Sequence, residues 1–119
     1  MRSLLAMARA YHAEMNAPWP FDPEAFLDVV EAIRINGFFR LTDKGFIAGA
    51  VNRNPLNPEW RVGTQIMWYG DADLIRQFRK WAKAQGVNEI HCSCKPETRV
   101  ERFYSSFAQP CDAVYSEVI

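Results

Sequence analysis

The 119-residue sequence lacks an excess of charge of either sign, because 14 Lys and Arg residues balance 14 Asp and Glu residues. Without a basic excess, its composition does not favour nucleic acid or an anionic membrane as a partner. It also lacks long apolar runs: residues 45–51 form one of the longest, against the roughly 20 residues of a membrane-spanning helix. Its first residues have no apolar signal segment. We therefore expect a cytoplasmic protein that binds neither nucleic acid nor membrane.

Cysteine is scarce, and the three present, Cys92, Cys94 and Cys111, are an odd number. An odd count suits a reducing compartment better than a framework of disulfides. His91 stands beside the first two, but no second pair of ligands occurs elsewhere, so we expect no metal site. A chain of this length can bury one hydrophobic core, and we expect a single domain over residues 1–119.

Apolar residues recur at helical spacing in two N-terminal segments, residues 3–15 and 23–36. The second segment has the clearer boundaries, because Asp22 can cap it, Pro23 suits its first turn and Gly37 can end it. We expect two helices, each of which buries an apolar stripe.

After the second helix the period changes and predicts three strands, over residues 38–42, 46–51 and 61–68. Residues 43–45 suit a tight hairpin turn, whereas residues 52–59, with two Asn-Pro steps, suit a longer exposed loop. We expect the three strands to form an antiparallel meander.

Four further elements follow: a helix over residues 73–85, a strand over 89–94, a short helix that begins with the capping box from Thr98 to Glu101, and a strand over 113–119. The strand, helix and strand between residues 61 and 94 require a right-handed crossover between parallel neighbours. The predicted fold class is therefore α/β (α+β), a mixed sheet flanked by helices in the order ααβββαβαβ. We expect a cleft where the two parallel strands separate, with a helix N-terminus pointing at it.

Residues 65–70 and 78–86 resemble the strand and the long helix of GNAT-like proteins that tailed bacteriophages encode. Gly49 matches a glycine that this family usually has in the preceding strand, and residues 101–107 are similar to its late helix. The resemblance extends over nearly the whole chain. It implies the fold of the GNAT superfamily of acyl-CoA-dependent N-acyltransferases, in a shortened, degenerate form.

The resemblance implies acetyl-CoA as the cofactor and a pyrophosphate loop at the start of the long helix. The family pattern there is Arg or Gln, two residues, Gly, one residue, then Gly or Ala. Gly70 and Ala72 match it, whereas Met67 replaces the Arg or Gln. Asp71 and Asp73 compete with a phosphate for the free N–H groups of the helix, so we expect them to cap it and to weaken or abolish coenzyme A binding. The implied cofactor contacts are Ile66, Met67, Trp68, Gly70, Asp71 and Ala72.

In the late helix, Tyr104 stands where the family often has a tyrosine that protonates the departing thiolate of coenzyme A. Its other interpretation is packing in an aromatic cluster with neighbouring phenylalanines. The base that takes a proton from the amine is open among Glu14, His12 and His91, of which we select Glu14.

Two functions remain open. The first is transfer of an acetyl group from acetyl-CoA to an amine, with backbone N–H groups around residues 66–68 polarising the thioester carbonyl. The alternative is a non-catalytic phage protein that uses the same fold as a virion component or as a binder of a host protein. An enzyme requires an open cleft, whereas a binding protein can fill it with Trp68, Tyr69 and other large side chains. A phage protein would act in the host cytoplasm or in the virion; activity, acceptor and oligomeric state stay open.

Overall fold

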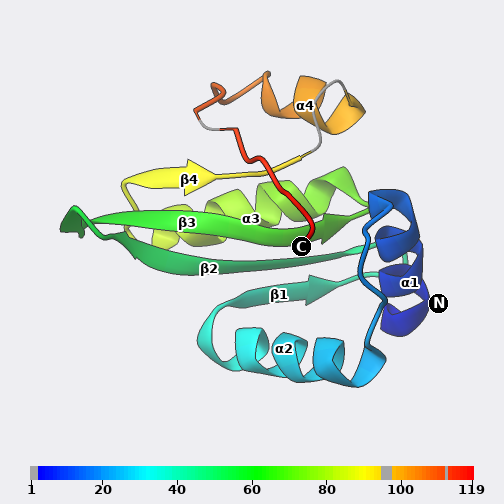
Figure 1. Cartoon of the computed structure of the whole chain (residues 1–119). Helices are drawn as coiled ribbons and strands as arrows, with labels where there is room; N and C mark the ends of the chain where they lie inside the picture. The colour runs from blue at the N-terminus through cyan, green and yellow to red at the C-terminus, as the bar shows by residue number, and fades with distance from the viewer. Residues whose placement is uncertain (1–2, 95–97, 112) are drawn as a thin grey trace.

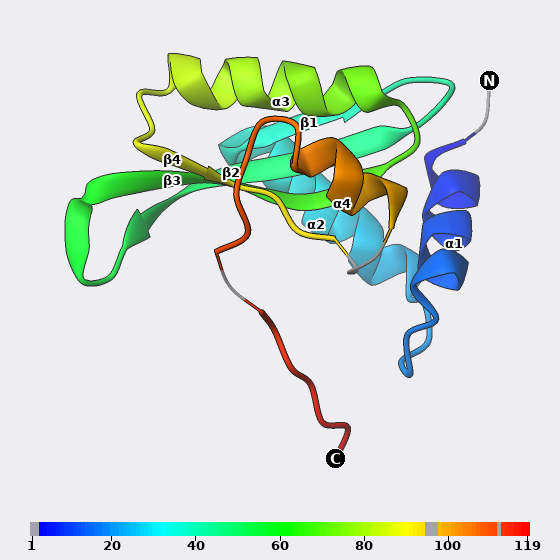
Figure 2. The ribbon, with the colours of Figure 1, turned by 90° about the horizontal axis from the view of Figure 1, so that it is seen from above.

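A computed structural model describes residues 3–94, 98–111 and 113–119. A four-stranded sheet in the order β1-β2-β3-β4 consists of β1 (Phe38–Leu41), β2 (Phe46–Asn54), β3 (Asn57–Tyr69) and β4 (Glu89–His91). Two helices, α1 (Leu4–Met15) and α2 (Pro23–Asn36), pack on one face, and α3 (Ala72–Ala84) covers the other (Figures 1 and 2). The short α4 (Arg99–Tyr104) lies beyond β4. No helix in these three ranges is long and apolar enough to cross a membrane.

Both N-terminal helices begin where the sequence predicts. The hydroxyl of Ser3 accepts a hydrogen bond from the N–H of Ala6 at 3.1 Å, and the carboxylate of Asp22 accepts one from the N–H of Ala25 at 3.1 Å. Helix α2 ends at Gly37, whose N–H closes the last turn at 2.7 Å. Side-chain acceptors at these positions satisfy N–H groups that a helix leaves free at its start.

The mixed sheet is confirmed. Strands β1, β2 and β3 pair antiparallel, and β3 pairs parallel with β4 after the crossover through α3. The parallel pairing is short, because it joins only Val62 to Thr64 with the three residues of β4. Beyond Thr64 the two parallel strands separate.

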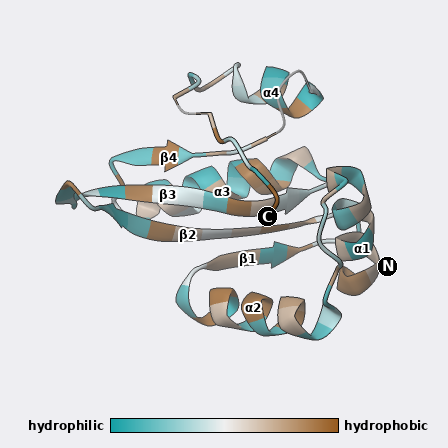
Figure 3. Cartoon of the chain, viewed as in Figure 1, coloured by the Kyte–Doolittle hydropathy of each residue, from teal (hydrophilic) through white to brown (hydrophobic). Residues whose placement is uncertain are grey.

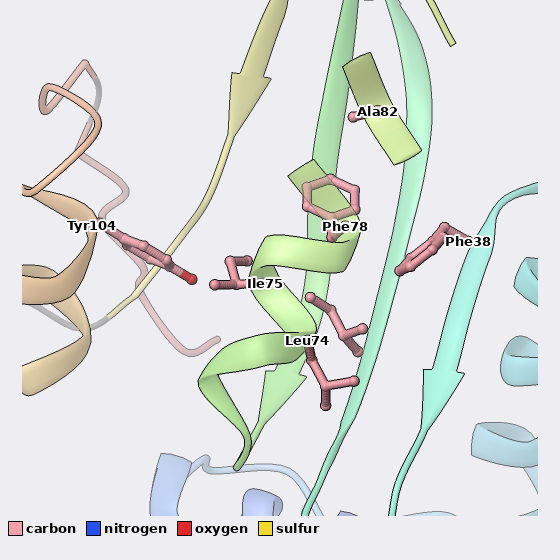
Figure 4. Close-up of a cluster of buried hydrophobic side chains, with 7 residues drawn as sticks. Phe38, Leu74, Ile75, Phe78, Ala82 and Tyr104 are labelled. Atoms are coloured by element: carbon pink, nitrogen blue, oxygen red, sulfur yellow. The ribbon is translucent and has the colours of Figure 1, made fainter. Parts of the chain in front are cut away.

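Each face of the sheet carries its own hydrophobic cluster, because neighbouring side chains on a strand point to opposite faces. Phe38 faces α3, whereas Phe39 faces α1 and α2. The α3-side cluster (Figure 4) consists of Phe38, Ile47, Leu74, Ile75, Phe78, Ala82 and Tyr104. The α1-side cluster consists of Met7, Ala8, Val30, Phe39, Phe46 and Ala48.

Two sequence predictions about strands are wrong. Residues 52–59 are not a long exposed loop, because β2 runs to Asn54 and β3 begins at Asn57. The backbones of β2 and β3 stay paired there, but the side chains are mostly exposed. The segment therefore shows no alternation of buried and exposed residues from which a strand could be predicted. Residues 113–119, predicted as the last strand, form none, so the order ends with α4. A β-prone segment becomes a strand only when another strand pairs with it, and this one pairs with none in the described part of the chain.

We expect Phe78→Ala to lower the free energy of unfolding by about 3–5 kcal/mol, since it removes a fully buried ring from the α3-side cluster. The ring packs directly on Gly49, where a Cβ atom would lie 2.3 Å from Phe78 Cε1. Because glycine has no side chain, Gly49 cannot fill the cavity that the substitution leaves. Urea denaturation measures the loss. Leu56→Ala, at a hairpin residue that is 96% exposed, is the control and should change stability by less than about 0.5 kcal/mol. Equal stability of the two variants would show that Phe78 is not a core residue.

Candidate functional site

A β-bulge interrupts β3 close to the point where it leaves its parallel partner. Gly49 of β2 is opposite Gln65, whereas the residue before Gly49 is opposite Met67. Ile66 is therefore the extra residue of the bulge. Since the parallel pairing ends at Thr64, the bulge lies where the sequence predicts a cleft between parallel strands.

The side chain of Gln65 closes this separation. It is 5% exposed, and its Oε1 accepts hydrogen bonds from the N–H of Ser93 at 2.9 Å and from the hydroxyl of Tyr104 at 3.3 Å. The Ser93 hydroxyl lies 3.5 Å from the same oxygen, and the Tyr104 hydroxyl lies 3.3 Å from the Ser93 carbonyl oxygen. We name these three residues the Gln65 junction. The junction links β3, the chain that follows β4, and α4.

Tyr104 enters the junction from α4 and points toward α3 (Figure 4). Only 7% of the residue is exposed. Burial raises the pKa of its hydroxyl far above the ordinary value of 10.0, and the neighbouring thiols of Cys92 and Cys94 raise it further by smaller amounts. The hydroxyl is therefore neutral and engaged with Gln65 and Ser93.

Large aromatic side chains fill the space beside the junction. The Trp68 ring lies 5.8 Å from the rings of both Phe103 and Tyr104, and its Nε1–H donates to the Asp71 carbonyl oxygen at 3.0 Å. The Arg79 guanidinium of α3 lies 3.8 Å from the centroid of the Phe107 ring, which holds the segment after α4 against α3. Trp68 thus packs against α4, whereas Tyr69, the other side chain expected to fill the cleft, packs against the α1-side cluster on the opposite face.

Helix α3 is capped by Asp71, as the sequence predicts, whereas the carboxylate of Asp73 does not cap and instead accepts from the side-chain amide of Gln77 at 3.0 Å. Asp71 is the N-cap: its carboxylate accepts from the N–H of Asp73 at 2.9 Å and its carbonyl accepts from the N–H of Leu74 at 3.1 Å. Gly70 has a φ of +87°, and a Cβ there would lie 2.0 Å from the carbonyl oxygen of Lys44, so this position requires glycine. The carboxylates of Asp71 and Asp73 both lie at the positive end of the α3 dipole.

A pocket of about 330 Å³ lies on the other face of the sheet, between α1, the segment that joins α1 to α2, and the β-bulge. Most of its lining is apolar or aromatic, and its polar side chains are Tyr11, His12 and Asp22. Ile66 and Met67, the residues at the bulge, form part of its wall. The bulge is thus reached from the α1 side through this pocket.

Two side chains of α1 are held in place beside the pocket. Nε2 of His12 lies 2.8 Å from the carbonyl oxygen of Trp19. Because a carbonyl only accepts, His12 donates from Nε2, and its neutral form carries a lone pair on Nδ1. Burial raises the pKa of Tyr11, and the nearby backbone of Trp68 counteracts part of that rise.

The structure places Glu14 and His91 away from the pocket, whereas Met67 lines it. Glu14 is exposed on α1 and does not line the pocket, and His91 pairs with the carboxylate of Glu89 at 3.0 Å. Met67, aligned with a phosphate-binding Arg or Gln, packs instead against the α1-side cluster. Ala72 is the exposed first residue of α3. Across the described ranges, no three His, Cys, Asp or Glu residues are grouped so that they could hold a metal ion.

Sequence reasoning missed Gln65 and Tyr11 as residues of the site. A signal existed for Gln65, since a polar residue inside an apolar strand needs a hydrogen-bond partner when it is buried. Tyr11 lies in the predicted helical segment of residues 3–15 and lines the pocket. Its proximity to the backbone of Trp68 leaves no mark on the sequence.

Comparison with solved structures relates this fold to N-acetyltransferases. AAC(6')-Iy, in complex with the bisubstrate analogue CoA-S-monomethyl-acetylneamine, has a TM-score of 0.64 at 15% identity, over 97% of this chain and 91% of that chain. The ribosomal-protein-alanine N-acetyltransferase of Brucella melitensis biovar Abortus 2308 has a TM-score of 0.61 at 14% identity, over 96% of this chain and 88% of that chain. The glucosamine-6-phosphate N-acetyltransferase of Arabidopsis thaliana has a TM-score of 0.62 at 10% identity, over 98% of this chain and 95% of that chain.

No protein-family model matches the chain, and no curated protein matches its sequence. The chain has the fold of the GNAT acetyltransferases, as its sequence predicts. At identities between 10% and 15% this likeness establishes the fold, and the activity has to be argued from the site.

We expect the buried Tyr104 hydroxyl to make the protein sensitive to alkali. A raised pKa in the folded state stabilises the protein fully below the unfolded value of 10.0, and this contribution is lost as the pH rises above it. Burial likewise raises the pKa of Cys92 from 9.0 to about 11. The free energy of unfolding should therefore fall from about pH 9 upward, and less steeply above pH 10 in Tyr104→Phe.

The matched control is Tyr115→Phe, because Tyr115 is 92% exposed. Chemical denaturation between pH 7 and pH 11 measures both curves. If the two variants lose stability with the same slope above pH 10, Tyr104 is not buried in the way described.

Proposed function

We propose that the chain is an N-acetyltransferase-like protein, of the shortened, degenerate kind that tailed phages encode, in which coenzyme A binding is weakened or lost. The observation that carries this proposal is the Gln65 junction. It occupies, with the chain's own side chains, the separation of parallel strands in which folds of this kind hold a ligand. Residues 1–119 would act as one domain, in the host cytoplasm or in the virion.

The start of α3 adds a second obstacle to coenzyme A. A pyrophosphate there would meet the carboxylate of Asp71, which already holds the N–H of Asp73. One carboxylate at roughly 5 Å costs on the order of 1 kcal/mol in a water-exposed site, and each N–H donor that is lost costs about 1 kcal/mol more. Together these terms weaken coenzyme A binding by about ten- to a hundredfold.

The catalytic candidates support low activity. The Tyr104 hydroxyl would have to leave Gln65 and Ser93 before it could act as an acid. Glu14 lies outside the pocket, whereas His12 lines it and is the better-located base for an amine. We therefore propose that transfer of an acetyl group from acetyl-CoA to an amine is slow or absent.

A non-catalytic phage protein, used as a virion component or as a binder of a host protein, is the second candidate function. The packing of Trp68 against α4 favours it, because a filled cleft is what such a protein can tolerate. Helix α2 also carries exposed apolar side chains, among them Leu27, Val29 and Ile35. Figure 3 shows hydrophobic residues along the ribbon of α2. A surface of this kind suits contact with another protein.

Calorimetric titration with acetyl-CoA tests the proposal. We expect the wild type to bind with a dissociation constant above about 100 µM. Asp71→Asn keeps the acceptor that caps α3 and removes its charge, while Asp71→Gly removes both. Affinity should therefore rise from the wild type to the asparagine variant and again to the glycine variant, by roughly three- to tenfold at each step.

Asp28→Asn removes one negative charge from α2 without touching α3, and it should leave the affinity for acetyl-CoA unchanged. Thermal unfolding of each variant establishes that it is folded. The proposal fails if the wild type binds acetyl-CoA at low micromolar concentration, or if Asp71→Gly is folded and binds more weakly than the wild type.

A further inference from the structure

The pocket beside the β-bulge is walled by side chains that suit an apolar molecule. Tyr11, Trp19, Phe21 and Phe26 contribute aromatic rings, and Ile66 contributes an aliphatic surface. Its volume of about 330 Å³ lies at the lower end of the range of about 300–1,000 Å³ that small-molecule sites span. The pocket therefore fits a ligand of about one ring with a short chain.

The aromatic wall is continuous and already assembled. The His12 ring lies 5.0 Å from that of Trp19 and 5.9 Å from that of Phe21, and the Phe21 ring lies 5.6 Å from that of Phe26. A hydrogen bond of 2.8 Å between Nε2 of His12 and the carbonyl oxygen of Trp19 holds these two residues of the wall together. A wall that is ordered before binding loses little side-chain entropy when a ligand enters.

The polar groups of the pocket favour a ligand that donates hydrogen bonds. Asp22 accepts one hydrogen bond from the N–H of Ala25, but a carboxylate can accept about four, so it can accept from a ligand as well. His12 donates to Trp19 through Nε2, and its neutral ring offers the other nitrogen as an acceptor. The carboxylate disfavours an anion and favours a cation.

The aromatic rings of the pocket also favour a positively charged ligand. The guanidinium of Arg9 lies 5.3 Å from the centroid of the Phe21 ring, and its charge would repel a second cation at that ring. The rings of Trp19 and Tyr11 also line the pocket and can attract a cation through their faces. An amine that is protonated at neutral pH meets both requirements.

We propose that this pocket binds a small amine on a largely apolar body, in chemical class an arylalkylamine, with its nitrogen at Asp22. The inference rests on the proposed function in one respect, since an amine is the acceptor in acetyl transfer, but the binding itself requires no coenzyme A. Amines carried on polyhydroxylated rings fit the pocket poorly. Their hydroxyl groups would lie against apolar walls and lose hydrogen bonds to water without replacing them.

Binding of four probes to the full chain tests this: 2-phenylethylamine, glucosamine, 3-phenylpropionate and the neutral 2-phenylethanol. Calorimetry and the amide NMR shifts of Ala8, Ile66 and Met67 report the affinity and the place of binding. We expect 2-phenylethylamine to bind at least about tenfold more tightly than glucosamine or 3-phenylpropionate, with shifts at those amides.

Asp22→Asn isolates the charge, because asparagine caps a helix about as well as aspartate does. It should lower the affinity for 2-phenylethylamine by about five- to tenfold and leave the affinity for 2-phenylethanol unchanged. Asp28→Asn, in the helix that Asp22 caps, should change neither affinity. The comparison of probes on the wild type stands without any variant.

The inference is overturned if 2-phenylethylamine does not bind at about 10 mM, if glucosamine or 3-phenylpropionate binds as tightly, or if Asp22→Asn behaves like Asp28→Asn. These outcomes are separate from those for acetyl-CoA. Amine binding is measured without coenzyme A, and the proposed function is tested at Asp71, on the other side of the sheet.

Discussion

A single amide oxygen, Oε1 of Gln65, is the acceptor on which the parallel end of this sheet depends. It accepts from Ser93 and Tyr104 at the place where β3 and β4 separate. A buried polar group left unpaired costs about 1–3 kcal/mol, so the three residues hold one another in position. Through Ser93 the junction fixes the path of the chain after β4, and through Tyr104 it fixes α4 against α3.

The junction makes the two sides of the sheet unlike. On the α3 side, side chains of the protein occupy the separation of the parallel strands, and Asp71 takes an N–H group that an anion would need. On the α1 side, the pocket leads to the bulge at Ile66. The ring of Trp68 packs with Tyr104 of α4. The α1 side therefore keeps an open pocket, whereas the α3 side is filled.

The helix caps that the sequence predicted have local causes, and the mixed sheet follows from the order of the elements. Asp22 and Asp71 cap helices by reaching N–H groups two or three residues away, so their spacing alone indicates the contact. The bulge at Ile66 depends on the register of β3 against β2, and Gln65 finds Ser93 at a distance of 28 residues along the chain. Neither contact leaves a local pattern. The strand predicted at residues 113–119 failed for the same reason, since propensity does not say whether a partner strand is present.

Hydrogen exchange at the Ser93 amide is the sharpest test of the Gln65 junction, because within the described ranges this N–H donates to the Gln65 side chain. Without any ligand, we expect this amide to exchange at least about 10²-fold more slowly than it would in an unfolded peptide. Exchange at the rate of an unprotected amide would show that the junction does not form, since the separation of β3 and β4 would then be open to water.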